Sequence, residues 1–548
     1  MTRRPALVIL CLIALAVAVP VTGGELGFGK AGASPSPVGL AGPAAGSDAP
    51  PTLPSSGSTG TGTDAATPTP TPGVVEAAGA PTDVPIVPVA QFRTTRTSTT
   101  IAEVKAVLAG SSSRYEALEL VKDEADAVLA ALGVDRPKVA ARLVEAKDAP
   151  TLQKDLAKHR KRLAFLRADA VGPGVRALSW RGKTLFGNDR VTKLASWPLT
   201  ATLPTGSAAA FDPTATWTMV AGGDIMLDRG VYETLRVKGK GANFAFDGGT
   251  AEITSRYCCS SFGWKVPRTK RTGGKGEMRA LIKGADVALA NFENPAPNSF
   301  KWHHSGTIFS ADPTLIDGIR NAGFDVMGTA NNHIRDQGGA GLLQTLKNLQ
   351  KRGLKTAGSG KNLAAARKPA IIETHGVKVA ILAYDAIAAS YHATASKVGS
   401  APLSAKVVIA DVKKAKANGA DVVIVFPHWG TEYHAKPNPG QVTLAHRILD
   451  AGADMIIGNH PHWTQAMEVY KGKPIWYALG NLVFDQTWSE ETMEGMTLEL
   501  TFDGSRLAQV RIRPHVLLDK AQANFLDPAG SGKIVMDRVF KNSTNLGW

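Results

Sequence analysis

Side chains that can bind metals follow the ends of five short apolar segments in this chain. The segments are TMVAGGD, VALANFE, DVMGTANNH, VVIVFPH and DMIIGNHPH, and they end at Asp224, Glu293, His333, His428 and His462. Short apolar runs are typical of buried strands, and the carboxyl ends of neighbouring parallel strands share one crevice in an open α/β sheet. We therefore expect carboxylates, an amide and imidazoles to converge there as a metal centre.

The two carboxylates are predicted ligands for different reasons. A Gly-Asp pair is more often a turn or a helix cap than a metal ligand, but Asp224 stands at the head of the series of strand ends. Glu293, in the sequence NFENP, should end a buried strand, where an unpaired carboxylate is costly. We predict that both side chains bind metal and that Glu293 can bridge two ions.

The remaining ligands are predicted from their spacing. A single histidine is more often a core or surface residue than a ligand, but His428, His460 and His462 all follow apolar segments. Alternate residues of an extended chain project to one side, and Pro461 restricts the backbone between His460 and His462. With the neutral oxygen of Asn332, this set suits manganese, zinc or iron better than calcium. Two such ions could activate a hydroxide and hold both the attacking and the leaving oxygen of a phosphoester.

The elements that must position these side chains lie between 215 and 515. Strand-like and helix-like patterns alternate there, which is typical of a layered α/β domain. Leucines at helical spacing predict two of the helices, one with Leu342, Leu346 and Leu349 and one with Leu444 and Leu449. The first helix should begin near Gln337, where Asp336 either caps it or orients the imidazole of His333. Residues 516–548 are assigned to a C-terminal tail.

A separate small α/β module is predicted over 84–199. A capping-box pattern predicts a helix over 113–132, leucine spacing predicts a second helix through 152–166, and a hairpin is expected about Gly182. The basic run at 158–162 either contacts a polyanion or is a solvated helix face. The module contains no pattern of catalytic residues.

The N-terminal sequence predicts export. Arg3 and Arg4 precede an apolar run over 6–19, which has the length of a signal-peptide core and is short for a membrane span. We predict that residues 1–24 are a signal peptide or an uncleaved N-terminal anchor. Residues 25–83 are rich in Pro, Gly, Ser, Thr and Ala, cannot bury enough apolar surface to fold, and are predicted to be a disordered linker.

The chain is basic. Its 548 residues, enough for two or three domains, carry a formal net charge of +15, and residues 1–85 hold three basic and five acidic side chains, so the remainder carries +17. Such an excess favours anionic partners, namely envelope polymers, lipid head groups of a membrane surface or nucleic acid, unless it only solvates the surface. Export argues against nucleic acid.

The cysteines exclude a disulfide framework. Cleavage of the apolar run would leave only Cys258 and Cys259, and adjacent cysteines cannot connect distant segments. They form either a vicinal disulfide or two ordinary thiols.

Six ordered motifs carry a family resemblance. They are GGDIMLDRGV, NFENP, TANNHIRDQG, FPHWGTEY, GNHPH and YALGNLVFDQ. Over 215–515 the chain resembles the bacterial capsule synthesis proteins of the CapA or PgsA type, which are associated with poly-γ-glutamate. The resemblance implies a fold like that of calcineurin-like metallophosphatases, with central sheets flanked by helices, and a role in the synthesis of an anionic envelope polymer. It does not extend to the linker or to the 84–199 module.

The resemblance also implies a role for each motif. Asp224 and His462 would hold a first divalent ion, Asn332, His428 and His460 a second, and Glu293 both. His333 would be the general acid near the leaving group, with Asp336 and Glu432 in supporting roles.

One position departs from the wider phosphoesterase pattern, which has Asp-x-His where this chain has Asp224, Ile225 and Met226. The first metal site is then weaker, or it is completed by Asp228 or by water. Two hypotheses follow. The chain is either a metal-dependent hydrolase or transferase that acts outside the membrane on an anionic envelope polymer or a phosphoester, or a non-catalytic accessory protein that binds such a polymer during export or attachment. The full ligand set favours the hydrolase, and Met226 favours the accessory protein.

Overall fold

The computed structural model describes residues 79–205 and 211–548. The predicted signal segment or anchor and the linker as far as residue 78 lie outside this part of the chain. The last residues assigned to the linker, from Gly79, already belong to a strand. No helix among the described residues is long and apolar enough to cross a membrane.

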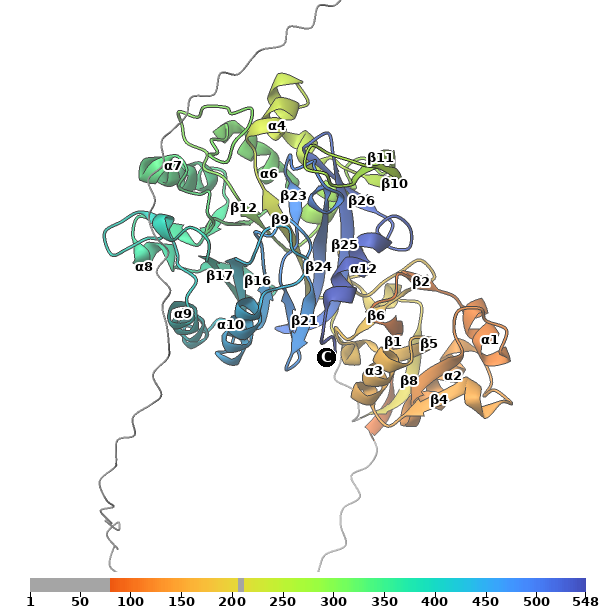
Figure 1. Cartoon of the computed structure of the whole chain (residues 1–548). Helices are drawn as coiled ribbons and strands as arrows, with labels where there is room; N and C mark the ends of the chain where they lie inside the picture. Colours follow the sequence, from red (N-terminus) through yellow and green to blue (C-terminus); the bar gives the residue numbers. More distant parts are fainter. Residues whose placement is uncertain (1–78, 206–210) are drawn as a thin grey trace, which may run out of the picture. The chain divides into compact units, whose positions relative to one another are not determined.

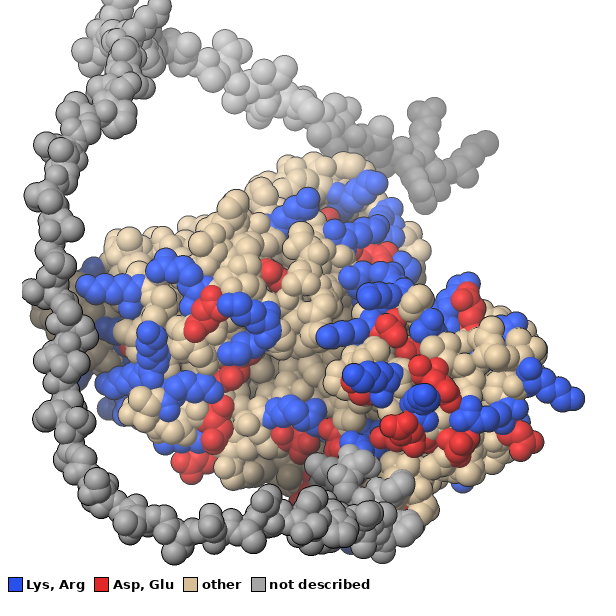
Figure 2. All heavy atoms as spheres, turned by 90° about the horizontal axis from the view of Figure 1, so that it is seen from below, with Lys and Arg blue, Asp and Glu red and all other residues tan. Residues whose placement is uncertain are grey.

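Basic side chains are spread over the surface. On the face seen from below in Figure 2, Lys and Arg lie among Asp and Glu rather than in one unbroken basic area. The net charge alone therefore does not identify a binding face.

The larger of two central sheets has ten strands (Figure 1). In spatial order these are β11 (Val266–Gly273), β10 (Thr250–Tyr257), β26 (Gln522–Leu526), β25 (Arg506–Leu518), β24 (Glu494–Asp503), β9 (Thr216–Ile225), β12 (Val287–Phe292), β13 (Val326–Gly328) and β14 (Lys355–Ala357), with β23 (Asn481–Val483) also beside β9. The strands β9, β12, β13 and β14 are parallel, so their carboxyl ends share one edge. Residues 516–548 supply the end of β25, all of β26 and helix α12 (Lys533–Asn542), and are therefore part of the domain rather than a tail.

The smaller central sheet has six strands. Their order is β16 (Ala370–Thr374), β17 (Val377–Asp385), β19 (Val422–His428), β20 (Met455–Ile457), β22 (Lys473–Trp476) and β21 (Met467–Tyr470). Helix α9 (Ala405–Ala417) connects β17 to β19, and α10 (Pro439–Asp450) connects β19 to β20. These neighbours are parallel, so the carboxyl ends of β19 and β20 also meet at one edge.

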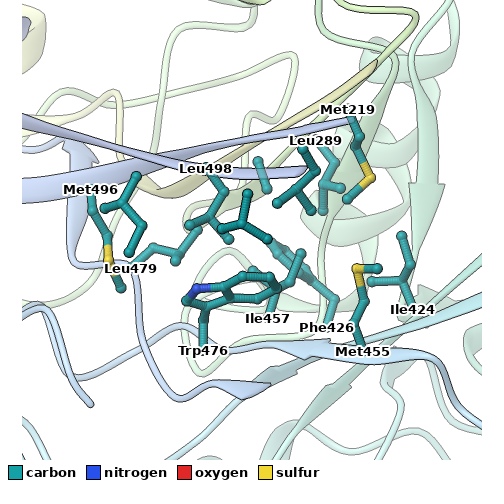
Figure 3. Close-up of a cluster of buried hydrophobic side chains, with 14 of the residues drawn as sticks. Met219, Leu289, Ile424, Phe426, Met455, Ile457, Trp476, Leu479, Met496 and Leu498 are labelled. Carbon is teal, nitrogen blue, oxygen red and sulfur yellow. The ribbon is translucent and has the colours of Figure 1, made fainter. Parts of the chain in front are cut away.

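The two sheets pack face to face over an apolar core (Figure 3). Met219 and Leu289 enter it from the larger sheet and Phe426, Ile457 and Trp476 from the smaller one, and all are buried. Further apolar clusters place α5 (Glu277–Lys283), α6 (Ile316–Ala322) and α7 (Gly338–Gln350) on the outer face of the larger sheet, and α9 and α10 on that of the smaller. The predicted layered α/β fold, with central sheets flanked by helices, is confirmed. The two helices predicted from leucine spacing are confirmed as α7 and α10.

Residues 79–205 form a third sheet with helices. Its strands are β4 (Leu143–Ala146), β3 (Ala117–Val121), β5 (Arg162–Arg167), β1 (Gly79–Gln91), β6 (Val175–Ala177) and β8 (Thr200–Thr205), and its helices are α1 (Ile101–Ala109), α2 (Ala125–Leu132) and α3 (Ala149–Lys158). The short strands β2 (Ser98–Thr99) and β7 (Ser179–Trp180) also belong to this part of the chain. The short elements β15 (Ser359–Gly360), α8 (Leu363–Ala366) and β18 (Gly399–Ser400) belong to the layered domain.

Both long helices predicted for this module are wrong in their bounds. The segment predicted as a helix over 113–132 divides into strand β3 and helix α2, because Ala117–Val121 is buried on both faces. The segment 152–166 likewise divides into the end of α3 and β5. Apolar spacing that matched a helix came from two consecutive elements in each case. The turn about Gly182 is present, but it joins only a single bridge between Trp180 and Lys183.

Candidate metal centre

The side chains predicted to bind metal converge where the carboxyl ends of both central sheets meet. Asp224, Glu293 and Asn332 come from β9 and from the segments after β12 and β13, whereas His428, His460 and His462 come from β19 and the segment after β20. The donors thus come from two facing sheets rather than from one continuous sheet edge. Each sheet supplies chemically different groups, carboxylate and amide oxygens from the larger and imidazoles from the smaller.

One carboxylate is shared by two groups of potential ligands. Two groups of potential metal ligands, Glu293 with His428 and His460, and Asp224 with Glu293 and His462, each have ligand atoms within 4.8 Å of one another. All five side chains are buried. Glu293 belongs to both groups and could therefore contribute a ligand atom to either.

The group of Glu293, His428 and His460 is centred on one imidazole nitrogen. Nε2 of His428 lies 2.7 Å from Oδ1 of Asn332, 3.1 Å from Nδ1 of His460 and 3.7 Å from Oε1 of Glu293. Asn332 therefore adds a neutral oxygen to this group. A mixed set of two imidazoles, an amide and a carboxylate suits a transition metal such as manganese, zinc or iron.

In the group of Asp224, Glu293 and His462, the distances between ligand atoms are longer. Nδ1 of His462 lies 3.6 Å from Oδ2 of Asp224, and Nε2 lies 3.8 Å from Oε1 of Glu293. Asn481 determines the tautomer: its amide nitrogen donates to Gln486 and to a backbone carbonyl, so its Oδ1 accepts from Nδ1 of His462 at 2.9 Å. The lone pair of Nε2 is then directed away from Asn481 and is available to a metal.

The buried carboxylates fit a metal better than they fit an empty protein interior. Oε1 of Glu293 is buried and has no hydrogen-bond partner among the described residues. Burial, together with nearby Asp224, raises the pKa of Glu293 well above its usual range, and burial raises the pKa of Asp224 to about 6. Two adjacent buried carboxylates are costly without a compensating cation, and divalent ions held by both would supply that charge.

The imidazoles are also in the form that binds metals. Burial lowers the pKa of His460 to about 4 and holds the pKa values of His428 and His462 well below the usual range. Neutral imidazole is the ligand form of histidine. The donor set therefore fits divalent metal ions.

The backbone at the two final histidines differs from the extended chain that the spacing predicted. His460 has φ 100° and His462 has φ 56°, both in the left-handed region that non-glycine residues rarely adopt. The imidazoles converge because of these two positive φ angles, not because alternate residues of a strand face one side. Tyr433 and Arg229, near the same ligands, also have positive φ. Strained backbone of this kind is typical of functional sites.

Asn291 is a functional residue that the sequence analysis missed. Its amide nitrogen lies 2.8 Å from Oδ1 of Asp224, 3.4 Å from Oε2 of Glu293 and 3.2 Å from Nδ1 of His428. Its own oxygen accepts from Asn331. The alternation of side chains along β12 placed Asn291 on the same side as Glu293, so the signal was present in NFENP.

Replacing Asn291 with alanine should weaken metal binding about 10–100-fold, because outer hydrogen bonds orient the ligands. The measurement is a metal dissociation constant by chelator competition. Asn348→Ala is the matched control, since Asn348 is also a buried amide whose nitrogen bonds Ala296 and Asn298, away from the ligands. Equal loss of metal affinity in both variants would mean that Asn291 acts only on general stability.

His333 is held by a carboxylate beside the metal ligands. Its Nδ1 lies 2.9 Å from Oδ2 of Asp336, which also accepts from the backbone of Phe309, and Oδ1 of Asp336 accepts from the hydroxyl of Tyr391 at 3.0 Å. No hydrogen-bond partner for Nε2 of His333 appears among the described residues. Asp336 therefore orients the imidazole, and helix α7 begins after Gln337 without a side-chain cap.

Glu432 and Asp228 do not join either ligand group. Glu432 lies on the segment after β19, hydrogen-bonds Tyr433 and raises the pKa of Glu293 through its charge. Asp228 was considered as a completing ligand where Met226 replaces histidine. Its carboxylate is instead occupied by the imidazole of His303 and by backbone N–H groups, including that of Ser310. Asp228 thus holds the 297–310 segment in place and leaves the first group without a further protein ligand from this motif.

Arg229, which also went unnoticed in the sequence, brings a cation to the centre. Its guanidinium lies over the rings of Phe309 and Phe484, 5.0 and 5.7 Å from their centroids. The Phe309 ring packs on His333 at 4.2 Å, and the Phe484 ring packs against His462 at 4.8 Å between centroids. The guanidinium also pairs with the carboxylate of Asp485 and donates to the carbonyl of Gly306 at 2.8 Å. Its charge is therefore balanced by a carboxylate, and it holds these segments together beside the centre.

Comparison with known proteins gives a consistent result. Residues 218–486 match the model of the family described as bacterial capsule synthesis protein PGA_cap. The chain is 35% identical to the capsule biosynthesis protein CapA of Bacillus anthracis over 271 residues, 48% of this chain and 63% of that protein, so it spans less than two thirds of that relative. It is 30% identical over 275 residues to the PGA biosynthesis protein CapA of Bacillus subtilis (strain 168), which is 50% of this chain and 72% of that one.

Two further proteins are similar to this chain. A probable polyglutamine synthesis accessory protein of Mycobacterium tuberculosis is 30% identical over 294 residues, 49% of this chain and 74% of that one. Among solved structures, the calcineurin-like phosphoesterase YfkN from Bacillus subtilis is 15% identical with a TM-score of 0.28, over 55% of this chain and 90% of that one.

Proposed function

The chain belongs to the bacterial capsule synthesis protein family, and we propose that it is a metal-dependent hydrolase that acts in the assembly of an anionic capsule polymer of the poly-γ-glutamate type. Its substrate is the polymer itself or a phosphoester formed during its assembly. The apolar N-terminal run after Arg3 and Arg4 supports a site of action outside the membrane, in the cell envelope.

The observation that carries this proposal is the pair of buried ligand groups that share Glu293, whose Oε1 has no hydrogen-bond partner among the described residues. A surface that only binds a polymer through its charge does not need three buried imidazoles directed at two carboxylates. Two bound divalent ions would lower the pKa of a water molecule and neutralise the charge that develops on the attacking and leaving oxygens.

The chain's own residues then account for proton transfer and for the exclusion of bulk water. In hydrolysis of a phosphoester, the oxygen of water adds to phosphorus while the bond from phosphorus to the leaving oxygen breaks. His333, oriented by Asp336, donates a proton from Nε2 to that leaving oxygen. The buried rings of Phe309 and Phe484, between which the guanidinium of Arg229 lies, limit access of bulk water.

The test is a turnover assay on the purified chain, stripped with a chelator and then reconstituted with manganese, zinc or iron. The substrates are bis(p-nitrophenyl) phosphate and poly-γ-glutamate, with release of nitrophenol and shortening of the polymer as the readouts. Metal-dependent turnover of either substrate is the expected result. Absence of turnover with every metal, in protein that holds its metal, would contradict the hydrolase.

A second candidate function is that of a non-catalytic accessory protein that binds the polymer during export or attachment. It is favoured by the buried Met226 at the position of the expected histidine, because the adjacent Asp228 is already occupied and cannot compensate. The relative from Mycobacterium tuberculosis, described as a probable accessory protein, is compatible with this role.

Salt-dependent polymer binding separates the two functions. The +17 charge beyond residue 85 should give binding to poly-γ-glutamate that weakens steeply between about 0.1 and 1 M salt, where the screening length falls from about 10 to about 3 Å. The measurement is titration calorimetry with metal-loaded and metal-stripped protein. Binding that survives metal removal favours the accessory role, whereas binding lost with the metal places the polymer at the metal centre. If neither form binds at low salt, the charge excess only solvates the surface.

A further inference from the structure

A series of aromatic side chains extends from the surface to a predicted metal ligand. The rings of Phe262 and Trp264 are 6.4 Å apart, those of Trp264 and Tyr433 are 5.5 Å apart, and those of Tyr433 and His462 are 6.2 Å apart between centroids. Trp463 and Trp488 lie beside it, at 6.2 Å from Trp264 and 5.5 Å from Phe262. We call Phe262, Trp264, Tyr433, Trp463 and Trp488 the aromatic row. None of its members is fully buried, so each keeps some exposed surface.

The β10–β11 hairpin supplies the outer end of the aromatic row. Phe262 and Trp264 lie in the segment that joins the two strands, next to the disulfide between Cys258 and Cys259. The pair of strands stands at the edge of the larger sheet, and β11 is its edge strand (Figure 1). Phe262 is 65% exposed, which is unusual for so large an apolar side chain. A large exposed ring beside a candidate site indicates an interaction surface.

The tip of the hairpin is fixed to the domain near the centre. The guanidinium of Arg256 donates through Nε to both carboxylate oxygens of Glu490, at 2.8 and 2.7 Å. The backbone N–H of Glu490 donates to the carbonyl of Lys265 at 3.0 Å. Glu490 begins the short helix α11 (Glu490–Met493), so the aromatic row is held in position before any ligand arrives.

The hairpin also carries cations without acidic partners. Residues 250–273 contain five Lys or Arg side chains and one acidic side chain, Glu252. Arg256 and Arg271 form ion pairs, and Lys270 lies 3.9 Å from Glu252. The exposed side chains of Lys265 and Arg268 have no ion-pair partner among the described residues. Positive charge on an edge strand also discourages pairing with other chains, but that role does not require an adjacent row of rings.

We propose that the aromatic row, with Lys265 and Arg268, binds an extended anionic polyamide chain and leads it to the metal centre. The amide planes and methylene groups of such a chain pack on the ring faces, as extended peptides do in aromatic grooves, and its carboxylates pair with the two cations. A charged chain is favoured over a neutral one by the two unpaired cations. This inference rests on the proposed function for the chemistry of the polymer, but the binding surface is separate from the ligand groups and can be tested without turnover.

The test compares two double charge reversals that change the net charge equally. Lys265→Glu with Arg268→Glu removes the two hairpin cations that have no ion-pair partner, of which Arg268 lies over the ring of Tyr257, and Lys413→Glu with Lys414→Glu removes two exposed cations on α9. Binding of poly-γ-glutamate is measured by titration calorimetry at about 0.1 M salt. The hairpin variant should lose about tenfold more affinity than the α9 variant, because only its charges contact the chain. Phe262→Ala, which changes an exposed side chain, should lose about threefold.

Three outcomes would overturn the proposal. Equal loss of affinity in the two double variants would mean that binding depends on net charge alone. Unchanged binding by Phe262→Ala would remove the rings from the surface. Equal affinity of the wild-type protein for polygalacturonate, with the same loss in the hairpin variant, would show that the surface binds an acidic glycan instead of a polyamide. Because all arms measure binding, a failure of the hydrolase assay alone would leave the surface supported and the catalytic function contradicted.

Discussion

A variant that carries His460→Ala and His462→Ala should bind no stoichiometric transition metal, whereas the wild-type protein should bind it. One imidazole is lost from each ligand group, and the groups share only Glu293. The groups that remain, His428, Asn332, Glu293 and Asp224, form incomplete sites with one imidazole between them, and carboxylate-rich sites suit harder cations than the mixed set does. The measurement is metal content by mass spectrometry after reconstitution with manganese, zinc or iron and removal of free ions.

The fold should persist in this double variant. Both histidines lie in the segment after β20, outside the apolar core between the sheets. Their positive φ angles are unfavourable for histidine and alanine alike, so the substitutions add no backbone strain. The matched control is His375→Ala with His446→Ala, because each of these imidazoles also pairs with a carboxylate, Asp286 at 3.2 Å and Glu468 at 2.8 Å, away from both ligand groups. Full metal occupancy in the His460 and His462 variant, or equal loss in the control, would refute the metal centre.

Much of the layered domain could be predicted from the sequence, because its strands are buried on both faces and therefore appear as continuous apolar runs. The segment ending at His428 is such a run, and it forms β19 as expected. The same feature misled the prediction of the 84–199 module. The run that forms β3 and the apolar face of α2 follow each other without a glycine or proline between them, so their combined spacing matched one helix.

The site was predictable to the extent that its ligands stand directly at strand ends. Asp224, Glu293 and His428 fit that description. Asn291 was indicated by its alternation with Glu293, but its contact with Asp224 on the neighbouring strand depends on strand pairing. The contact of Asn481 with His462 depends on how the two sheets face each other, and a single sequence contains neither pairing. The positive φ angles of His460 and His462 were likewise hidden, because sequence patterns indicate regular backbone and these residues depart from it.

Arg229 was missed for a related reason. An arginine after an aspartate usually indicates a solvated surface or a helix start, and here it does open α4 (Arg229–Tyr232). Its burial between Phe309 and Phe484 depends on segments more than seventy positions away in the chain. Long-range packing of this kind also separates Asp228 from the ligand set, since the 297–310 segment occupies its carboxylate.

Replacing His333 with alanine should lower turnover by about 10²–10⁴-fold while the protein keeps its full metal content, because a general acid contributes to proton transfer and not to ligand binding. His333 belongs to neither ligand group, and its Nδ1 is committed to Asp336. Turnover is measured with bis(p-nitrophenyl) phosphate, whose leaving group needs little protonation, and with a phosphodiester of a simple alcohol, whose leaving group needs much. The loss should be larger for the second substrate, which a merely structural role for His333 would not produce.

Asp336→Asn separates orientation of the imidazole from its chemistry. The amide keeps the shape of the carboxylate but removes the charge that faces Nδ1 of His333, so turnover should fall by less than in His333→Ala while metal content stays unchanged. His446→Ala, which disrupts another histidine and carboxylate pair, should leave turnover intact. Parallel loss of metal and turnover in His333→Ala would make His333 a ligand, and unchanged turnover would remove it from the mechanism. Equal loss with both leaving groups would contradict proton donation, because only a proton donor discriminates between them.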